Sequence, residues 1–415
     1  MNSKTIRRTV LISLSAVVLL LVIVAITNRE ALAHKLNSNR VQETMVQEQN
    51  QGESGQIGND LSAFLRDEDF FEPEKKTSSV ITYHGKKVSL MISSMSQDLR
   101  IMMVDPVGEL CTGAPFEVEI EGEGTYTDTD QDGVIYLEHL RSGTYYVTLH
   151  PMDGYAIENT KVMVDVKQKL DYVALSDIAY LILQEDQVDV EKEDTGEHNA
   201  LEESDDTEVT GKEEFLHLGA LGIDVSKYNK EIDWEKVADS GVEFAIIRCG
   251  YRGSSSGALI EDPMFKTNIK GAKEAGLKVG VYFFSQAITE KEAVEEASMV
   301  EELCKYEQLD LPVYLDSESA GGQGRADHLS KKERTAVCAA FCRTIERAGH
   351  SAGVYASKNW FEQKLNTEEL EIYSLWLAQY TGVPTYGGSY QIWQYTSRGT
   401  VDGVPTKVDM NIKYK

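Results

Sequence analysis

Three patterns of hydrophobic and polar positions follow one another along the chain of 415 residues. Residues 10–27 form an uncharged apolar run, residues 99–183 hold short apolar or alternating runs between Gly, Asp and Pro, and residues 218–415 hold short apolar runs separated by helical patterns. The first run is just long enough to cross a hydrocarbon core of about 30 Å as a helix. The second pattern predicts strands without helices, and therefore a small all-β sandwich. The third predicts βα units around a parallel sheet.

Two helices of the C-terminal region are marked by capping boxes, "TEKE" at Thr289–Glu292 and "SKKE" at Ser330–Glu333. After "WLAQY" the helical pattern stops, and residues 390–397 and 408–414 predict plain strands. A TIM-like α/β barrel of βα units finished by plain strands fits roughly 200 residues better than a full eightfold barrel, which typically needs ~250.

Two polar stretches separate these regions. The first is rich in Gln, Glu and Asn and predicts a stalk. The second is a block of acidic residues whose only basic residues are Lys192 and Lys212. Such a block repels itself, which predicts an extended linker. The predicted multidomain organisation is a cytoplasmic tail at 1–9, a transmembrane signal anchor at 10–27, a polar stalk at 28–95, a β-sandwich at 96–184, an acidic linker at 185–216 and a barrel domain at 217–415.

Charge narrows the choice of partners and location. The chain has 68 acidic and 41 basic residues, and a net charge of -27 excludes nucleic acid as an expected partner. Lys4, Arg7 and Arg8 precede the apolar run, which predicts a single-pass membrane protein with a cytoplasmic N-terminus and extracellular C-terminal domains. The alternative is secretion after signal cleavage, because "ALA" at Ala31–Ala33 has the small-residue pattern of a cleavage site. The histidines lack HxH or HExxH spacing, so neither a metal nor a cofactor is expected.

Four acidic residues stand at or just beyond the ends of apolar runs: Asp224 in "LGIDVS", Asp316 and Glu318 in "VYLDSES", and Asp409 in "KVDMN". In parallel barrels the active site lies at the C-terminal end of the strands, so these acids could converge there. Neighbouring carboxylates raise one another's pKa, which lets one stay protonated as a general acid while its partner is ionised. Glycoside hydrolysis typically uses such a pair. A polar loop that begins after a strand is the more ordinary explanation of an isolated Asp-x-Glu, but four acids at strand ends make a catalytic site an equally good one.

Aromatic rings near the same strand ends could stack on sugar faces, although each ring taken singly is more often part of a core. Two glutamines accompany them in "WLAQY" and "IWQYTS". The candidate substrate-binding residues are Tyr251, Tyr282, Phe284, Tyr355, Trp376, Gln379, Trp393 and Gln394.

The motifs "GIDVSKYNKEIDW", "GVYFFSQA", "VYLDSES", "GVYAS", "LWLAQY" and "IWQYTSRGTVDGVPTKVDMN" resemble, in order and spacing, those of glycoside hydrolase family 25. This family comprises lysozyme-type muramidases, which cleave the β-1,4 bond between N-acetylmuramic acid and N-acetylglucosamine in peptidoglycan. The resemblance implies that Glu318 is the general acid/base and that Asp316 is the nucleophile or the stabiliser of the 2-acetamido group. It also implies net retention, with Asp224 and Asp409 lining the groove and peptidoglycan glycan strands as the partner.

Two alternative functions of the barrel domain can be tested against this one. Chitinase-like barrels use D-x-x-D-x-D-x-E, but Leu311 and Tyr314 occupy the first two acidic positions here. A cell-wall-binding surface protein on a glycosidase-like barrel that has lost catalysis is the second alternative. The four acids argue against it.

The middle region resembles a Cna B-type (SpaA-like) domain through "GELCTGAPFEVEI" at Gly108–Ile120 and the stretch from Tyr126 to Tyr155. Such domains are mostly spacers on bacterial surfaces, and many carry a Lys–Asn isopeptide bond. Met103 stands where the reactive lysine would be expected, which argues against that bond.

Overall fold

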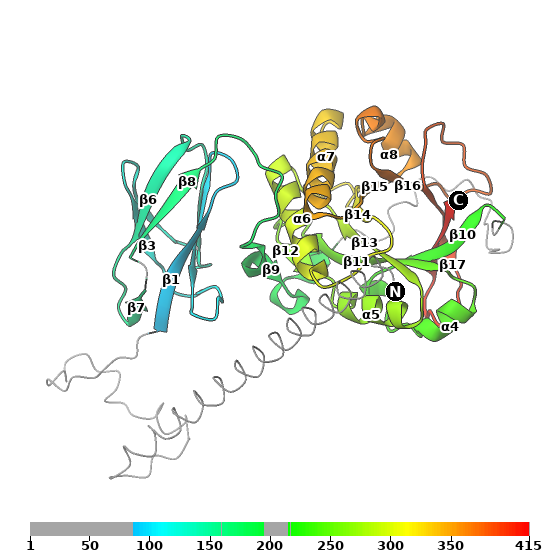
Figure 1. Ribbon diagram of the computed structural model, residues 1–415, viewed down its shortest axis with the longest axis horizontal. Helices are drawn as coiled ribbons and strands as arrows, with labels where there is room; N and C mark the ends of the chain where they lie inside the picture. Colours follow the sequence, from blue (N-terminus) through cyan, green and yellow to red (C-terminus); the bar gives the residue numbers. More distant parts are fainter. Residues whose placement is uncertain (1–85, 159, 195–214, 216, 415) are drawn as a thin grey trace, which may run out of the picture. The chain divides into compact units, whose positions relative to one another are not determined.

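The computed structural model describes residues 86–158, 160–194, 215 and 217–414. All described residues belong to one compact unit of the chain, Tyr83–Lys415. Within that unit the chain forms first a β-sandwich and then an α/β barrel (Figure 1).

The sandwich consists of two four-stranded sheets, with the orders β5-β2-β1-β7 and β4-β3-β6-β8. Alternate side chains of facing strands form one core, in which Leu99, Ile101, Met103, Val118 and Val147 are all fully buried. Its strands are β1 (Lys86–Ser93), β2 (Leu99–Val104), β3 (Glu117–Ile120), β4 (Gly124–Thr127), β5 (Val134–Leu137), β6 (Gly143–Leu149), β7 (Tyr155–Ile157) and β8 (Lys161–Val166).

The barrel is closed by eight strands in the order β10-β18-β17-β16-β15-β14-β13-β11, with β11 pairing back to β10. All neighbours pair in parallel except β18, which is antiparallel to both β17 and β10. The strands are β10 (Gly219–Val225), β11 (Phe244–Arg252), β13 (Lys278–Phe284), β14 (Val313–Asp316), β15 (Ala352–Ser357), β16 (Ser374–Ala378), β17 (Ile392–Gly399) and β18 (Val408–Tyr414).

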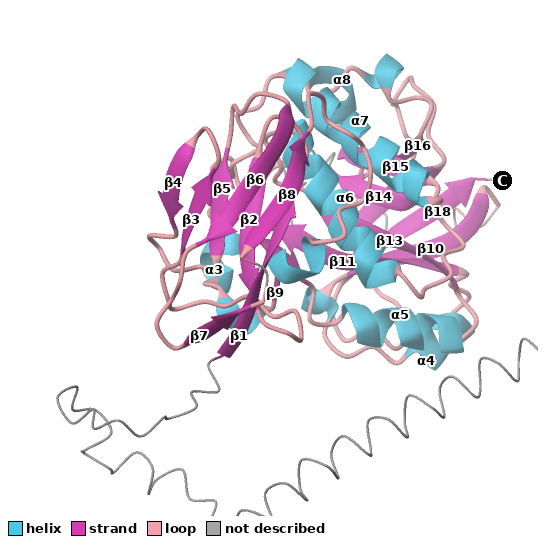
Figure 2. Ribbon diagram, turned by 60° about the vertical axis from the view of Figure 1, so that its left-hand side comes forward, coloured by secondary structure: helices cyan, strands magenta, loops and turns pink. Residues whose placement is uncertain are grey.

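Helices cover the outside of the barrel (Figure 2). They are α4 (Trp234–Asp239), α5 (Phe265–Glu274), α6 (Glu290–Cys304), α7 (Lys331–Ala348) and α8 (Lys358–Gln363). The capping box predicted at Ser330 is complete. At α6 only the Thr289 half forms, because the Glu292 carboxylate instead accepts the Ile288 N–H and pairs with Arg325.

The interior of the barrel is filled by side chains that alternate along the strands, among them Phe244, Tyr314 and Trp376. Gly222 and Gly353 make room for these rings, since a Cβ atom at either position would lie within 2.4 Å of a ring atom. Closer to the C-terminal ends of the strands, the inward positions become polar. This change of character creates the candidate site.

The segment before the barrel corrects the predicted organisation. Residues 185–194 were expected to begin an extended linker, but in the structure they pack on the barrel. Strand β9 (Ile182–Leu183) pairs in parallel with β12 (Leu259–Glu261), and the short helices η3 (Glu185–Gln187) and α3 (Val190–Glu193) follow it. Buried Arg248 partners the carboxylate of Asp194, which composition alone does not reveal.

The fold class predicted from the sequence, with its transmembrane helix, is also corrected. None of the helices in the described part of the chain is both long and apolar enough to span a membrane. The stretch predicted to span it, residues 10–27, lies outside the described residues.

Candidate active site

The four predicted acids line a single cavity of about 300 Å³ at the C-terminal end of the barrel strands. Asp316 is the last residue of β14, and Glu318 follows in the loop. Asp224 on β10 lies directly opposite Asp409 on β18 in the antiparallel register. Directly opposed residues have Cβ atoms about 4.5–5.5 Å apart, so four acidic groups share one small space.

Asp224 is held by two amides. Its Oδ2 atom accepts hydrogen bonds from Gln394 Nε2 at 3.0 Å and from Asn411 Nδ2 at 2.7 Å. The amide oxygens are engaged in turn, Asn411 Oδ1 by the Trp376 indole at 2.8 Å and Gln394 Oε1 by the Tyr355 hydroxyl at 2.9 Å. These contacts fix the orientation of both amides, so their donors point at the carboxylate.

Burial raises the pKa of Asp224 to about 6, although both amide hydrogen bonds act in the opposite direction. The carboxyl therefore titrates close to neutral pH, as groups in catalytic sites often do.

Asp316 is buried as well, with 5% of its surface exposed. Its Oδ1 atom has no hydrogen-bond partner among the described residues. Burial, and then the charges of Asp224 and Asp409, raise its pKa well above the ordinary value, while Arg248 opposes that rise. A buried carboxylate oxygen without a partner is costly, and because Asp316 lines the cavity its carboxylate is suited to receive a donor from a bound molecule.

Glu318 differs from Asp316 in its surroundings. It lines the same cavity but is partly exposed, because it stands one residue beyond the buried Ser317 in the loop. The alternation expected for residues at i and i+2 therefore brings both carboxylates to one cavity, with one deep in the wall and the other nearer solvent.

The predicted substrate-binding residues divide into two groups. Those that line the cavity are Tyr282, Phe284, Tyr355, Trp376 and Gln394. The rings of Tyr355 and Trp376 pack edge to face with centroids 4.6 Å apart, so the aromatic wall is rigid.

Three predicted residues lie outside the cavity lining. The Trp393 side chain points away from the interior, toward Phe215 and Tyr395, because its neighbour Gln394 takes the inward position. Gln379 bonds to Thr385, and Tyr251 is fully buried with its hydroxyl on Glu185.

Sequence reasoning missed several residues that shape the site. Arg248, Tyr228 and Tyr380 line the cavity, and Asn411 holds Asp224 from behind. Asn411 could have been found, because it stands two residues after Asp409 on the same strand and so shares its face. An arginine inside an apolar run gives a comparable signal at Arg248.

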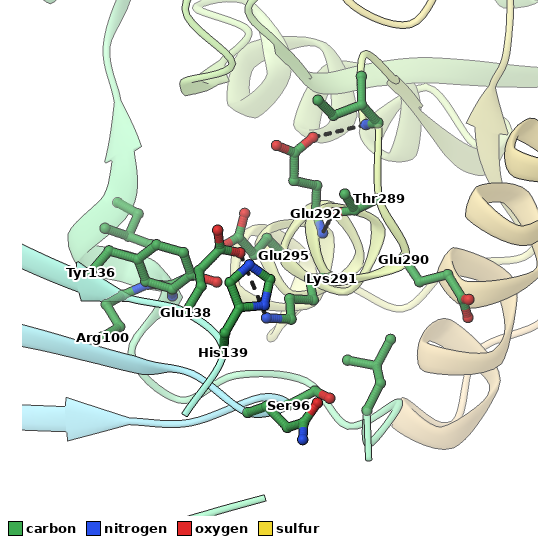
Figure 3. A pocket seen from close by; sticks show the side chains of 14 residues that line it. Ser96, Arg100, Tyr136, Glu138, His139, Thr289, Glu290, Lys291, Glu292 and Glu295 are labelled. Carbon is green, nitrogen blue, oxygen red and sulfur yellow. Dashed lines mark hydrogen bonds and ion pairs between the residues drawn. The ribbon is translucent and has the colours of Figure 1, made fainter. Parts of the chain in front are cut away.

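A larger cavity, of about 760 Å³, lies between the loops of the sandwich and the start of α6 (Figure 3). Its charged side chains are paired with one another or with close neighbours: Lys291 with Asp98 at 3.0 Å, Arg100 with Glu295, and Glu292 with Arg325. These pairs join opposite charges, in contrast to the crowded carboxylates of the smaller cavity. We therefore assign the chemistry to the smaller one.

Neighbouring acidic residues, of which Asp224 and Asp316 have raised pKa values, lie beside aromatic rings at the C-terminal end of an α/β barrel, and these are the features of a barrel glycoside hydrolase. Comparison with known proteins agrees, since the family model described as "Glycosyl hydrolases family 25" matches residues 223–404. The chain belongs to glycosyl hydrolase family 25.

Three similar proteins illustrate the match. The uncharacterized protein YegX of Escherichia coli O6:H1 is 30% identical over 200 residues, which are 46% of this chain and 68% of YegX. The autolytic lysozyme of Clostridium acetobutylicum is 28% identical over 191 residues, or 46% of this chain and 54% of the lysozyme. The solved structure of the modular autolysin LytC from Streptococcus pneumoniae, in complex with a synthetic peptidoglycan ligand, is 28% identical with a TM-score of 0.42, and the match covers 47% of each chain.

Proposed function

We propose that the barrel is a peptidoglycan muramidase, which hydrolyses the β-1,4 bond between N-acetylmuramic acid and N-acetylglucosamine with net retention. The observation that carries the proposal is the pair Asp316 and Glu318 in one aromatic-walled cavity, the first buried and the second partly exposed. Membership of family 25 and the likeness to an autolytic lysozyme support the choice of substrate.

In the first step Glu318 gives its proton to the glycosidic oxygen as the bond to the anomeric carbon breaks. Asp316, which lines the cavity, accepts the N–H of the substrate's 2-acetamido group with its carboxylate. The acetamido carbonyl oxygen then attacks the anomeric carbon and forms a cyclic oxazolinium. The negative charge of Asp316 stabilises this cation.

In the second step the Glu318 carboxylate takes a proton from a water molecule, whose oxygen attacks the anomeric carbon from the side that the leaving sugar vacated. The ring opens, the acetamido group is restored, and Glu318 is protonated again. Two inversions at one carbon give net retention.

Asp224 supports this chemistry through charge. With Asp409 it keeps negative potential at the base of the cavity, where the sugar ring becomes cationic. The amides of Gln394 and Asn411 fix its position, so the charge does not have to reorganise during the reaction.

We also propose an extracellular site of action, because the substrate is a cell-wall polymer. In this proposal the sandwich is a spacer of the Cna B-type that the motifs from Gly108 to Tyr155 resemble, and ion pairs such as Lys291–Asp98 hold it against the barrel. The accumulation of carboxylates favours catalysis over wall binding alone, since a binding site has no need to bury like charges.

One experiment separates these functions. Purified peptidoglycan is digested with the full chain, and the new reducing ends are identified by mass spectrometry after borohydride reduction. A muramidase yields reduced N-acetylmuramic acid. Reduced N-acetylglucosamine, or sedimentation with the wall without any new reducing end, would contradict the proposal.

A further inference from the structure

The segment that precedes the family match is attached to the barrel beside the cavity. The buried Glu193 carboxylate accepts the backbone N–H groups of Ser255 and Ser256, with distances of 2.9–3.2 Å. The Glu193 carbonyl oxygen also accepts the Ser254 N–H at 2.9 Å. Together with the pairing of β9 to β12, these bonds fix both ends of the segment from Ile182 to Asp194 on the barrel.

The next residue, Asp194, reaches the wall of the cavity from behind. Its two carboxylate oxygens accept from the two terminal nitrogens of Arg248 at 3.3 and 3.1 Å. Asp262 accepts from Arg248 Nε at 2.7 Å, and Lys227 Nζ lies 2.7 Å from Asp194. Asp194 therefore forms a bidentate pair with the guanidinium. This geometry fixes the orientation of the arginine as well as its distance.

Rings complete the cage around Arg248. Its guanidinium carbon lies 5.2 Å from the ring centroid of Tyr228 and 5.0 Å from that of Tyr251. The same segment positions the second ring, because the Tyr251 hydroxyl donates to Glu185 at 2.9 Å. Arg248 itself lines the cavity that holds Asp316.

We propose that Asp194 is a positioning residue of the active site, which holds Arg248 in the cavity wall and away from direct contact with Asp316. The catalytic unit of this chain then begins near Ile182 and not at residue 223, where the family match starts. This inference rests on the proposed function, because it assigns a task to Asp194 in that reaction.

The charges around Arg248 explain why Asp194 is needed to keep the guanidinium away from Asp316. The groups that face Arg248 are Asp194 directly after α3, Asp262 from the loop after β12, Lys227 from the short helix η6 (Lys227–Asn229), Tyr282 from β13 and Asp316 from β14. Lys227 also pairs with Glu185, so Asp194 and Asp262 are the carboxylates that hold Arg248 itself. Without the charge of Asp194 both terminal nitrogens of the guanidinium lose their partner, and the nearby buried Asp316 attracts the guanidinium.

Contact between Arg248 and Asp316 would harm the reaction in two ways. It would occupy the carboxylate oxygen that receives the acetamido N–H. Burial and the charges of Asp224 and Asp409 raise the pKa of Asp316. Contact with Arg248 would lower this pKa, because the positive charge favours the ionised carboxylate. Asp316 must be ionised to act, so the acid limb of the pH profile would move to lower pH while the maximal rate fell.

The test is Asp194→Asn in the full chain, with Asp186→Asn as the matched control, because Asp186 is an exposed carboxylate of the same segment. Release of reducing ends from soluble glycan strands gives kcat, KM and the pH profile. We expect kcat of Asp194→Asn to fall by roughly tenfold or more, the effect of losing a charge-assisted hydrogen bond. We also expect its acid limb to move to lower pH, and Asp194→Glu to restore both in part.

A merely structural role predicts a different result. Poor folding would reduce the amount of active enzyme but leave the acid limb in place, since the position of a limb does not depend on enzyme concentration. The folded fraction isolated by gel filtration therefore gives a decisive profile even if the yield is low. An unmoved limb, or a kcat within about twofold of wild type, would overturn the inference. If wild type itself releases no reducing ends, the proposed function fails, and that result is distinct from an active wild type with an equally active Asp194→Asn.

Discussion

The buried carboxylates lower the stability of the folded protein at neutral pH, and we predict that Asp224→Asn raises it. Asp224 has 7% of its surface exposed and shares its cavity with three other acids. Its pKa is raised from 3.8 to about 6 by burial, against the hydrogen bonds from Asn411 and Gln394. The folded state therefore holds the proton of Asp224 more tightly than the unfolded chain does.

The sign and size of the effect follow from that shift. A carboxyl whose pKa is raised on folding favours the folded state below its unfolded pKa, and this contribution is lost as the pH rises through the folded pKa. Between pH 3.8 and about 6, stability should fall with rising pH. The shift from 3.8 to about 6 corresponds to at most roughly 3 kcal/mol of unfolding free energy at neutral pH.

Asparagine suits this test because its size is unchanged and its amide oxygen can still accept from both Gln394 and Asn411. We therefore expect Asp224→Asn to raise the unfolding free energy by about 1–3 kcal/mol at neutral pH and to lower activity. Urea unfolding of wild type and variant would be compared at about pH 4 and about pH 7.5, where the difference should be small and large, respectively.

The control is Asp402→Asn, which changes an exposed carboxylate in the same way and should leave stability nearly unchanged at both pH values. Equal or lower stability of Asp224→Asn at pH 7.5, or a difference that does not depend on pH, would refute the reasoning. Either result would mean that the buried negative charge of Asp224 does not lower the stability of the folded protein.

Two further substitutions test the roles of the pair. Glu318→Gln removes the proton donor with little change of shape, so kcat should fall by ~10²–10⁴ while thermal stability is kept, and the exposed Glu371→Gln should behave as wild type. Asp316→Asn removes the charge that stabilises the developing cation, so kcat should fall by at least ~10² with a much smaller change in KM. Steady-state release of reducing ends measures both, and a Glu318→Gln enzyme within about threefold of wild type would remove Glu318 from its role.

The sequence predicted the acids of the site because chain position and hydrophobic pattern together locate strand ends. Asp224, Asp316 and Glu318 each follow or close an apolar run, whereas Asp409 stands at the start of β18, which runs antiparallel to its neighbours and so brings Asp409 to the same end of the barrel. All four line the cavity. The start of α7 was also predicted from the sequence, since Ser330 caps this helix with the predicted capping box.

The pattern was less informative about which way a side chain points. Trp393 and Gln394 are neighbours near the start of β17, but only Gln394 takes the inward position. Along β11 the register shifts between Arg248 and Gly250, so alternation cannot be carried through to Tyr251. Simple proximity to a strand end therefore selected some residues outside the cavity and passed over Arg248.

The acidic segment shows a second limit of local composition. Residues 185–194 have the charge content of an extended linker, but Lys227 and Arg248 supply the countercharge from distant strands and loops. A count of charges within a window cannot detect such partners. Burial of Glu193 and Asp194 depends on the tertiary structure as a whole.

The central claim is that Glu318 and Asp316 hydrolyse the N-acetylmuramic acid linkage through the substrate's own acetamido group, with retention. Proton NMR during the first minutes of digestion of soluble glycan strands tests it most directly, because the anomeric signals appear before mutarotation mixes them. The account predicts a new N-acetylmuramic acid reducing end in the β configuration. An initial α-anomer, or a reducing end on N-acetylglucosamine, would contradict it.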